Sequence, residues 1–132
     1  MQIFNGRKGE MSIRVSYVVL YVNDVEACRN FWIEHIGMVE KERTEVGQHC
    51  VIKVGFADQL FAFELVPLAL MADNPDGLDL ATPSVALHVD DLKATRDLFV
   101  ERGVEAIEIG EHGGVRSFAF KDPENRWFAV TG

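Results

Sequence analysis

The sequence predicts an α+β domain in which two strand–helix–three-strand (βαβββ) modules together form one cupped mixed sheet. Three observations lead to this prediction. The chain has 132 residues, 48% of them apolar, which suits one domain or two small halves that share a core. Two stretches repeat the same order of strand, acidic turn, helix and glycine. After each helix, short segments of alternating apolar and polar residues indicate strands.

The repeated stretches are SYVVLYVNDVEACRNFWIEHIGM (16–38) and SVALHVDDLKATRDLFVERGV (84–104). The candidate helix N-caps are Asn23 or Asp24 in the first stretch and Asp90 or Asp91 in the second. Asn23 with Glu26 has the spacing of a capping box. Gly37 and Gly103 suit left-handed C-terminal caps, so the two predicted helices have nearly equal lengths.

Three short strands are predicted after each helix. Their ranges are 38–44, 50–54 and 59–66, then 106–109, 115–120 and 127–131. The glycine-rich stretch EHGGVR (111–116) is expected to be a flexible connection. Residues 67–83 carry three of the four prolines, which is typical of a linker. The predicted organisation is a flexible leader (1–11), a first module (12–66), a linker (67–82) and a second module (83–132).

Composition excludes several classes of partner. The formal charge is −8, from 21 acidic and 13 basic residues, and this sign disfavours nucleic acid and anionic membranes but favours cationic ligands. The apolar runs are too short to span a bilayer, and no secretory signal is recognisable. Cys28 and Cys50 form neither a metal motif nor a disulfide framework, so we expect buried free thiols in a cytoplasmic protein. His35 and His112 are expected to be solvated.

The duplicated unit, its opening YVNDVEACRNFW…GM and its ending FAFKDPENRWFAV resemble the vicinal oxygen chelate superfamily. That superfamily includes glyoxalase I, extradiol dioxygenases, fosfomycin-resistance enzymes and bleomycin-resistance proteins. The resemblance extends from about Ser12 to the C-terminus and implies the glyoxalase/bleomycin-resistance/dioxygenase-like fold, but it does not identify the reaction. In the family the closing turn usually has glycine where Asn125 stands, and asparagine tolerates the left-handed conformation that this turn needs.

Side chains alternate between the two faces of each predicted strand. One face is apolar and is expected to pack beneath the helices; the other mixes alanines with polar and aromatic residues. Alanines leave room, and buried polar groups need partners, so a cup that holds a small ligand explains the second face. An ordinary solvent-facing sheet is the alternative. The predicted ligand-binding residues are Tyr17, Tyr21, Glu64, Ser84, His88, Ser117 and Trp127.

The resemblance also implies where a metal would bind. Metal-using members place four ligands on this face, and the corresponding positions here are Tyr17, Glu64, Ser84 and Ala129. Glu64 alone matches the family pattern, which is a poor ligand set for a divalent cation. We therefore expect no cofactor, with a displaced divalent-metal site at Glu64, His88 and His49 as the alternative.

Three functions remain open from the sequence. The first is a metal-free, homodimeric protein that binds a small, cationic molecule, similar to bleomycin-resistance proteins. The second is a metal-dependent lyase or isomerase of the glyoxalase I type in which Glu64 is base or ligand. The third is metal-free acid–base catalysis by Glu64 and His88. The iron triad of a dioxygenase is missing from the expected positions. Whether the modules pair within a chain or across a dimer is also open.

Overall fold

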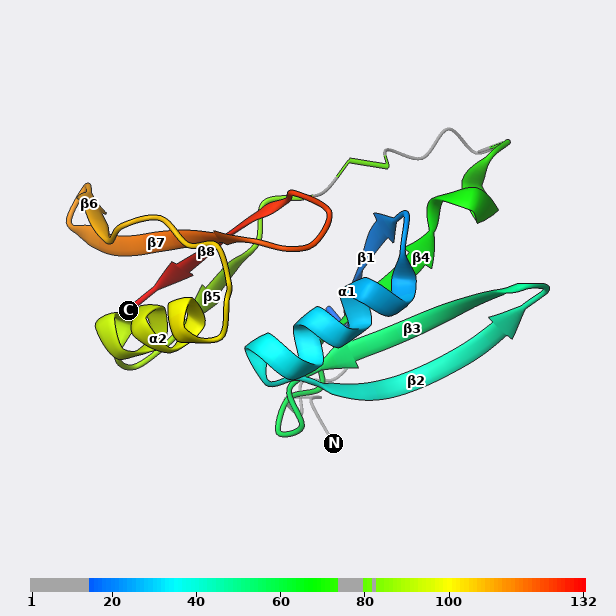
Figure 1. Cartoon of the computed structure of the whole chain (residues 1–132), viewed down its shortest axis with the longest axis horizontal. Helices are drawn as coiled ribbons and strands as arrows, with labels where there is room; N and C mark the ends of the chain where they lie inside the picture. The colour runs from blue at the N-terminus through cyan, green and yellow to red at the C-terminus, as the bar shows by residue number, and fades with distance from the viewer. Residues whose placement is uncertain (1–14, 74–79, 82) are drawn as a thin grey trace, which may run out of the picture.

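A computed structural model describes residues 15–73, 80, 81 and 83–132, so the expected leader (1–11) lies outside the described residues. The second module occupies the left of Figure 1 and the first module the right. The first module consists of β1 (Tyr17–Val22), α1 (Val25–Phe31), the π-helix η1 (Trp32–Ile36), β2 (Val39–Val46), β3 (His49–Gly55) and β4 (Ala62–Pro67). A 3-10 helix, η2 (Leu68–Met71), follows β4. The second module consists of β5 (Ala86–His88), α2 (Leu92–Glu101), β6 (Gly110–His112), β7 (Val115–Lys121) and β8 (Trp127–Thr131).

Each module forms one four-stranded mixed sheet, and the two sheets have the same topology. The strand orders are β1-β4-β3-β2 and β5-β8-β7-β6. The first strand of each module runs parallel to the last one, and the remaining pairs are antiparallel. The predicted duplication of a βαβββ unit is therefore confirmed.

The helix caps decide between the alternatives that the sequence left open. Asp24 and Asp91 are the N-caps, and their carboxylates accept hydrogen bonds of 3.0 Å from the backbone N–H groups of Ala27 and Ala94. Asn23 is not the N-cap, and no capping box forms: the backbone N–H of Asn23 donates to Glu124 at 3.0 Å, and the Glu26 carboxylate binds Arg43 at 2.7 Å. The glycine caps are confirmed, with φ of +101° at Gly37 and +83° at Gly103.

The sequence did not predict the π-helix η1, which continues α1 up to Gly37. It places His35 against Phe31, with the two ring centroids 5.5 Å apart. His35 is therefore half-buried and its Nδ1 atom is buried, which corrects the expectation of a solvated side chain. His112 is exposed as expected.

The predicted strand 106–109 is wrong. Ala106 makes a single bridge to Phe120, and the strand at this edge is β6, which begins four residues after Ala106. Arg96 of α2 explains the difference, because its guanidinium donates to the carbonyl oxygens of Ile107 at 2.7 Å and Ala106 at 3.4 Å. EHGGVR is not a loose connection but a tight hairpin, in which Gly113 and Gly114 both take positive φ between β6 and β7.

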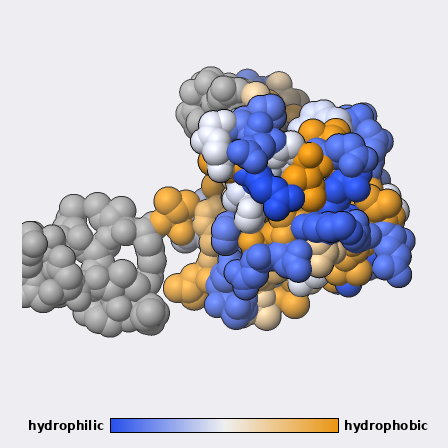
Figure 2. Space-filling view, turned by 90° about the vertical axis from the view of Figure 1, so that its left-hand side faces the viewer, coloured by the Kyte–Doolittle hydropathy of each residue, from blue (hydrophilic) through white to orange (hydrophobic). Residues whose placement is uncertain are grey.

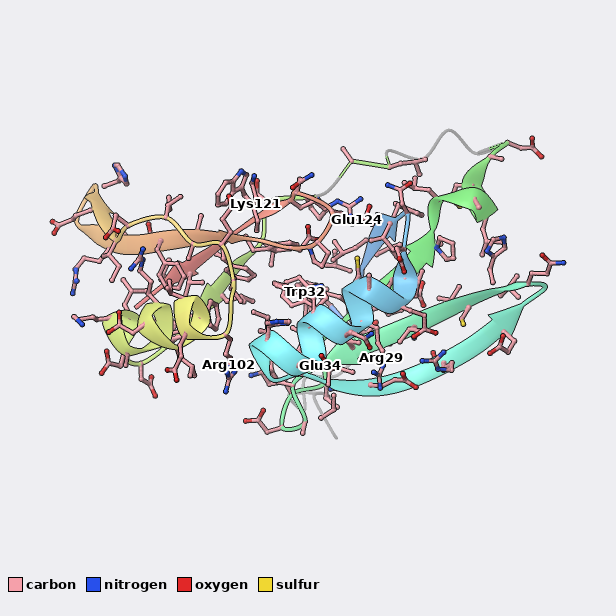
Figure 3. All side chains as sticks on the ribbon, in the orientation of Figure 1. Arg29, Trp32, Glu34, Arg102, Lys121 and Glu124 are labelled. Carbon is pink, nitrogen blue, oxygen red and sulfur yellow. The ribbon has the colours of Figure 1, made fainter. Side chains whose placement is uncertain are left out.

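The apolar face of both sheets forms one core, as the alternation predicted. Leu20, Phe63, Phe118, Phe128 and Val130 are each at most 2% exposed. Trp32, which is fully buried, joins the two halves of this core: its ring lies 5.0 Å from that of Phe63 in the first sheet and 4.9 Å from that of Phe128 in the second. In Figure 3, Trp32 points from η1 into the space between the modules. The modules of one chain thus pack through their helix-bearing faces.

The β7–β8 turn fastens the second module to the first. Asp122 holds the turn, because its Oδ1 atom accepts hydrogen bonds from the backbone N–H groups of Glu124 and Arg126, each at 2.9 Å. Asn125 has φ of +64°, so the predicted left-handed conformation is confirmed. The carboxylate of Glu124 accepts from the backbone N–H of Asn23 at 3.0 Å, just before α1, and Arg126 donates to the carbonyl of Tyr21.

Among the described residues, none of the helices has the length and apolar character required to cross a bilayer. The end of the molecule formed by the second module is mostly hydrophilic, with separate apolar areas between the polar side chains (Figure 2). Cys28 is buried and Cys50 is half-buried, and both thiols are free.

Candidate functional site

The outer faces of the two sheets, opposite the helices, carry the side chains predicted to bind a ligand. On the first sheet, Tyr17, Tyr21 and Glu64 lie on this face of β1 and β4, and Glu64 pairs with Val19 of β1. Tyr17 is 42% exposed, so this face is accessible in the single chain.

Glu64 is not a free carboxylate. Glu64 lies opposite Lys53 of β3. The Lys53 Nζ atom is 3.8 Å from Glu64 Oε2 and 3.1 Å from Glu42 Oε1. The same ammonium group lies 4.2 Å from the centroid of the Tyr17 ring, within cation–π range. A hydrogen bond to Glu42 raises the pKa of Lys53, so Lys53 remains a cation. A metal ion at Glu64 would compete with this ammonium group.

Three adjacent alanines form the middle of the outer face of the second sheet. Ala129 on β8 pairs with Ala86 on β5 and with Ala119 on β7. The register also shows that Ala129 has the same position in the second module as Glu64 in the first. Glu64 pairs with Val19, five positions before the N-cap of α1. Ala129 pairs with Ala86, five positions before the N-cap of α2. The equivalence inferred from spacing is therefore seen in the pairing.

Polar and aromatic residues flank the alanine row on its two sides. On one side lie His88, Thr131 and Ser117, which pair across β5, β8 and β7, with His88 Nδ1 3.3 Å from Thr131 Oγ1. On the other side Trp127 pairs with Lys121, whose Nζ atom is 5.1 Å from the Trp127 ring. Ser84 precedes β5 by two residues, and continuing the parallel register places it beside Trp127.

One chain does not bring the predicted residues into one cup. The modules meet through their helix-bearing faces, so the outer face with Tyr17, Tyr21 and Glu64 and the outer face with Ser84, His88, Ser117 and Trp127 remain separate. Trp127 is 45% exposed and His88 is exposed, as expected for a face that the described residues leave uncovered.

The donor set does not fit the metal that the resemblance implies. The four family positions hold a phenol, a carboxylate paired with Lys53, a serine and an alanine. The displaced set is also dispersed. His49 begins β3, four residues or roughly 13 Å along the strand from Lys53, and His88 belongs to the other sheet. Within the part of the chain that the structure describes, no three His, Cys, Asp or Glu residues gather as a metal site.

A cavity of about 600 Å³ lies where the two modules meet, beside β5. His88 and Ala86 line it on one side, and Phe56, Gln59 and Arg102 line it from other elements. These last three residues carry no signal in the sequence, because the cavity exists only once the modules pack together. The sole sequence signal was His88, predicted from strand alternation.

Comparisons with known proteins agree with this fold. The model of the Glyoxalase/Bleomycin resistance protein/Dioxygenase superfamily matches residues 14–130. No curated protein matches the chain. The solved structure of TnmS3, an antibiotic binding protein from Streptomyces sp. CB03234, has 20% identity and a TM-score of 0.75, covering 92% of this chain and 98% of that one.

A superfamily member from Sphaerobacter thermophilus DSM 20745 has 17% identity and a TM-score of 0.76, covering 90% of this chain and 96% of that one. A glyoxalase family protein from Enterococcus faecalis has 16% identity and a TM-score of 0.70, covering 90% and 97%. At these identities the structures show a common fold. The match of the family model over nearly the whole chain shows that this protein belongs to the Glyoxalase/Bleomycin resistance protein/Dioxygenase superfamily.

Proposed function

We propose that this protein binds a small, cationic, partly aromatic molecule on its outer sheet faces, without a metal at the usual family site and without chemical turnover. The observation that carries the proposal is the row Ala86–Ala129–Ala119 beside Trp127. Methyl groups at these three places project little from the sheet, so a flat apolar group can lie against it. The indole of Trp127 offers a stacking surface at its edge.

The outer face of the first sheet supports a cationic ligand. The carboxylates of Glu42 and Glu64 share the ammonium group of Lys53, at 3.1 Å and 3.8 Å. The chain as a whole carries −8, which raises the local concentration of cations. Tyr17 provides a further aromatic surface, although Lys53 now covers one side of its ring.

A second copy of the chain would complete the site. Because each outer face is open in the single chain, a homodimer that apposes the first sheet of one copy to the second sheet of the other would enclose the ligand between them. The exposure of Tyr17 and Trp127 supports this arrangement, since large aromatic side chains gain from being covered. That TnmS3 is an antibiotic binding protein is consistent with a binding role on this fold.

The test uses ethidium, a planar aromatic cation, as the probe in a fluorescence titration. Ala129→Leu puts a bulky side chain in the alanine row, Trp127→Ala removes the stacking surface, and each is expected to weaken binding about tenfold or more. Glu64→Gln removes one charge and is expected to weaken it about threefold to tenfold. Ala94→Leu, the same substitution on the exposed surface of α2, is the control and should change affinity by less than about twofold. Unchanged affinity in Ala129→Leu and Trp127→Ala would refute the proposed site.

Metal analysis separates this proposal from the lyase or isomerase alternative. Protein purified without chelator should contain little metal, and zinc, nickel, manganese or iron(II) should not raise its melting temperature. Stoichiometric metal that is lost in Glu64→Ala or His88→Ala would contradict the proposal and favour the enzyme.

A further inference from the structure

The cavity beside β5 has apolar walls from both modules. Ile36, Phe56 and Phe61 line it from the first module, and Leu87, Leu98 and Phe99 from the second. Its volume of about 600 Å³ lies within the range of small-molecule sites. A separate hollow of about 40 Å³ shares Phe56, Phe61 and Leu87 with it and is also lined by Met38 and Phe63.

Among the described residues, the guanidinium of Arg102 is the permanently charged group that lines this cavity. Arg102 and His88 are the ionisable residues among the described residues that line it, and no carboxylate lines it in that part of the chain. Arg102 Nη1 donates to the carbonyl oxygen of His35 at 3.1 Å, which anchors the guanidinium at the end of α2 (Figure 3). A guanidinium has five N–H donors, so an anchored Arg102 retains donors for a second acceptor.

β5 adds main-chain groups to the same cavity. Val85 and Val89 bond to β8, since Ala129 N–H donates to Val85 O at 3.1 Å and Val89 N–H donates to Thr131 O at 2.9 Å. In a parallel ladder the intervening residues direct their N–H and C=O groups to the opposite side. The main-chain groups of Ala86 and His88 therefore face the free edge of β5, where both residues line the cavity.

We propose that this cavity is a second binding site that takes an amphipathic organic anion, with a carboxylate at Arg102 and an aliphatic or aryl body among the apolar walls. The anion offers the oxygens that a guanidinium binds in pairs. The apolar walls of the cavity suit a chain of methylene groups or an aryl ring. This cavity shares Ala86 and His88 of β5 with the proposed cationic-ligand site, but its apolar walls come from the helix-bearing faces of the modules.

The probe is octanoate, measured by isothermal titration calorimetry, with octanol as its neutral analogue. Arg102→Gln is expected to weaken octanoate about fivefold or more while leaving octanol within about twofold. Arg116→Gln makes the same change of charge at an exposed position on β7 and should leave octanoate unchanged. No measurable octanoate binding, or equal losses in Arg102→Gln and Arg116→Gln, would overturn the proposal.

A second pair of variants tests the location without changing charge. Leu98→Trp fills the cavity from α2 and should abolish octanoate binding, whereas Val100→Trp, at an exposed position of the same helix that does not line the cavity, should preserve it. Trp127→Ala and Ala129→Leu should also preserve octanoate binding, since they act on the other site. If octanoate binding disappears as the chain dimerises, the cavity is occupied by the second copy of the chain, and the proposal is rejected.

Discussion

Glu64 on β4 and Lys53 on β3 lie directly opposite each other, with 3.8 Å between Oε2 and Nζ. Glu64 is the one residue that matches the metal-ligand pattern of the family. Because Lys53 pairs with it, a metal ion at Glu64 would compete with the ammonium group. Two carboxylates and the face of a tyrosine ring already surround the same ammonium group. We therefore regard the site as one that attracts cations weakly, rather than as a metal centre.

Lys53→Met should tighten ethidium binding by about threefold to tenfold, because it removes the cation that neutralises Glu64 and covers Tyr17. The free energy of unfolding should change by no more than about 1 kcal/mol, since partly exposed ion pairs contribute little. Lys93→Met is the matched control, because it breaks the exposed pair with Asp97 on α2. Weaker ethidium binding in Lys53→Met would show instead that Lys53 itself contacts the ligand.

Asp122→Ala should lower the free energy of unfolding by about 2–4 kcal/mol, because two backbone N–H groups of the β7–β8 turn lose their acceptor. Asp122→Asn keeps an oxygen acceptor, so its loss should be smaller. Urea unfolding of both variants measures the difference, and equal stabilities would contradict the role assigned to the carboxylate oxygen.

The stability difference between Asp122→Asn and the wild type should depend on pH. Burial raises the pKa of Asp122 above its ordinary 3.8, so the folded protein disfavours the ionised form. The protonated carboxyl thus stabilises the fold at low pH, and this contribution is lost as pH rises through the raised pKa. Relative to the wild type, Asp122→Asn should gain stability as pH rises from about 4 to 7. A constant difference across this range would argue against a buried, titrating carboxyl.

The fluorescence of Trp127 should report dimerisation. Trp32 is fully buried and Trp127 is 45% exposed, so the difference spectrum between wild type and Trp127→Phe isolates an accessible indole. If a second copy covers the outer face, this signal should shift to longer wavelength on dilution, together with dissociation seen by sedimentation. A chain that sediments as a monomer at every concentration would disprove the homodimer.

Native protein should expose one of its two thiols to Ellman's reagent. Burial raises the pKa of the Cys28 thiol to about 12, so almost no thiolate forms at neutral pH. Cys50 is half-buried at the surface, with its Sγ atom 3.4 Å from Arg43 Nη1, and should react first. Cys50→Ser should remove the fast phase, and both thiols should react after unfolding. A fast phase that persists in Cys50→Ser would contradict the burial of Cys28.

The elements that sequence analysis placed well are those set by local chemistry. The caps at Gly37 and Gly103, the turn at Asn125 and the buried strand residues follow from left-handed backbone preferences and from alternation, which act over a few residues. The misplaced strand at 106–109 failed for a non-local reason: Arg96, on the preceding helix, binds the carbonyl oxygens of Ala106 and Ile107. The N-cap at Asp24 was also decided at a distance, since Glu124 of the other module binds Asn23.

By itself, the sequence determined the duplicated module and which face of each strand is apolar, because spacing and periodicity are readable without contacts. That Ala129 stands where metal-using members carry a carboxylate is what the resemblance to the family implied. Tertiary structure decided that Lys53 lies beside Glu64, since a cross-strand neighbour depends on register. It also decided that the modules meet through Trp32 and leave their outer faces apart, and that a cavity with Arg102 opens beside β5. These outcomes depend on the packing of two halves that are distant in the chain, and such packing leaves no periodic signal in either half.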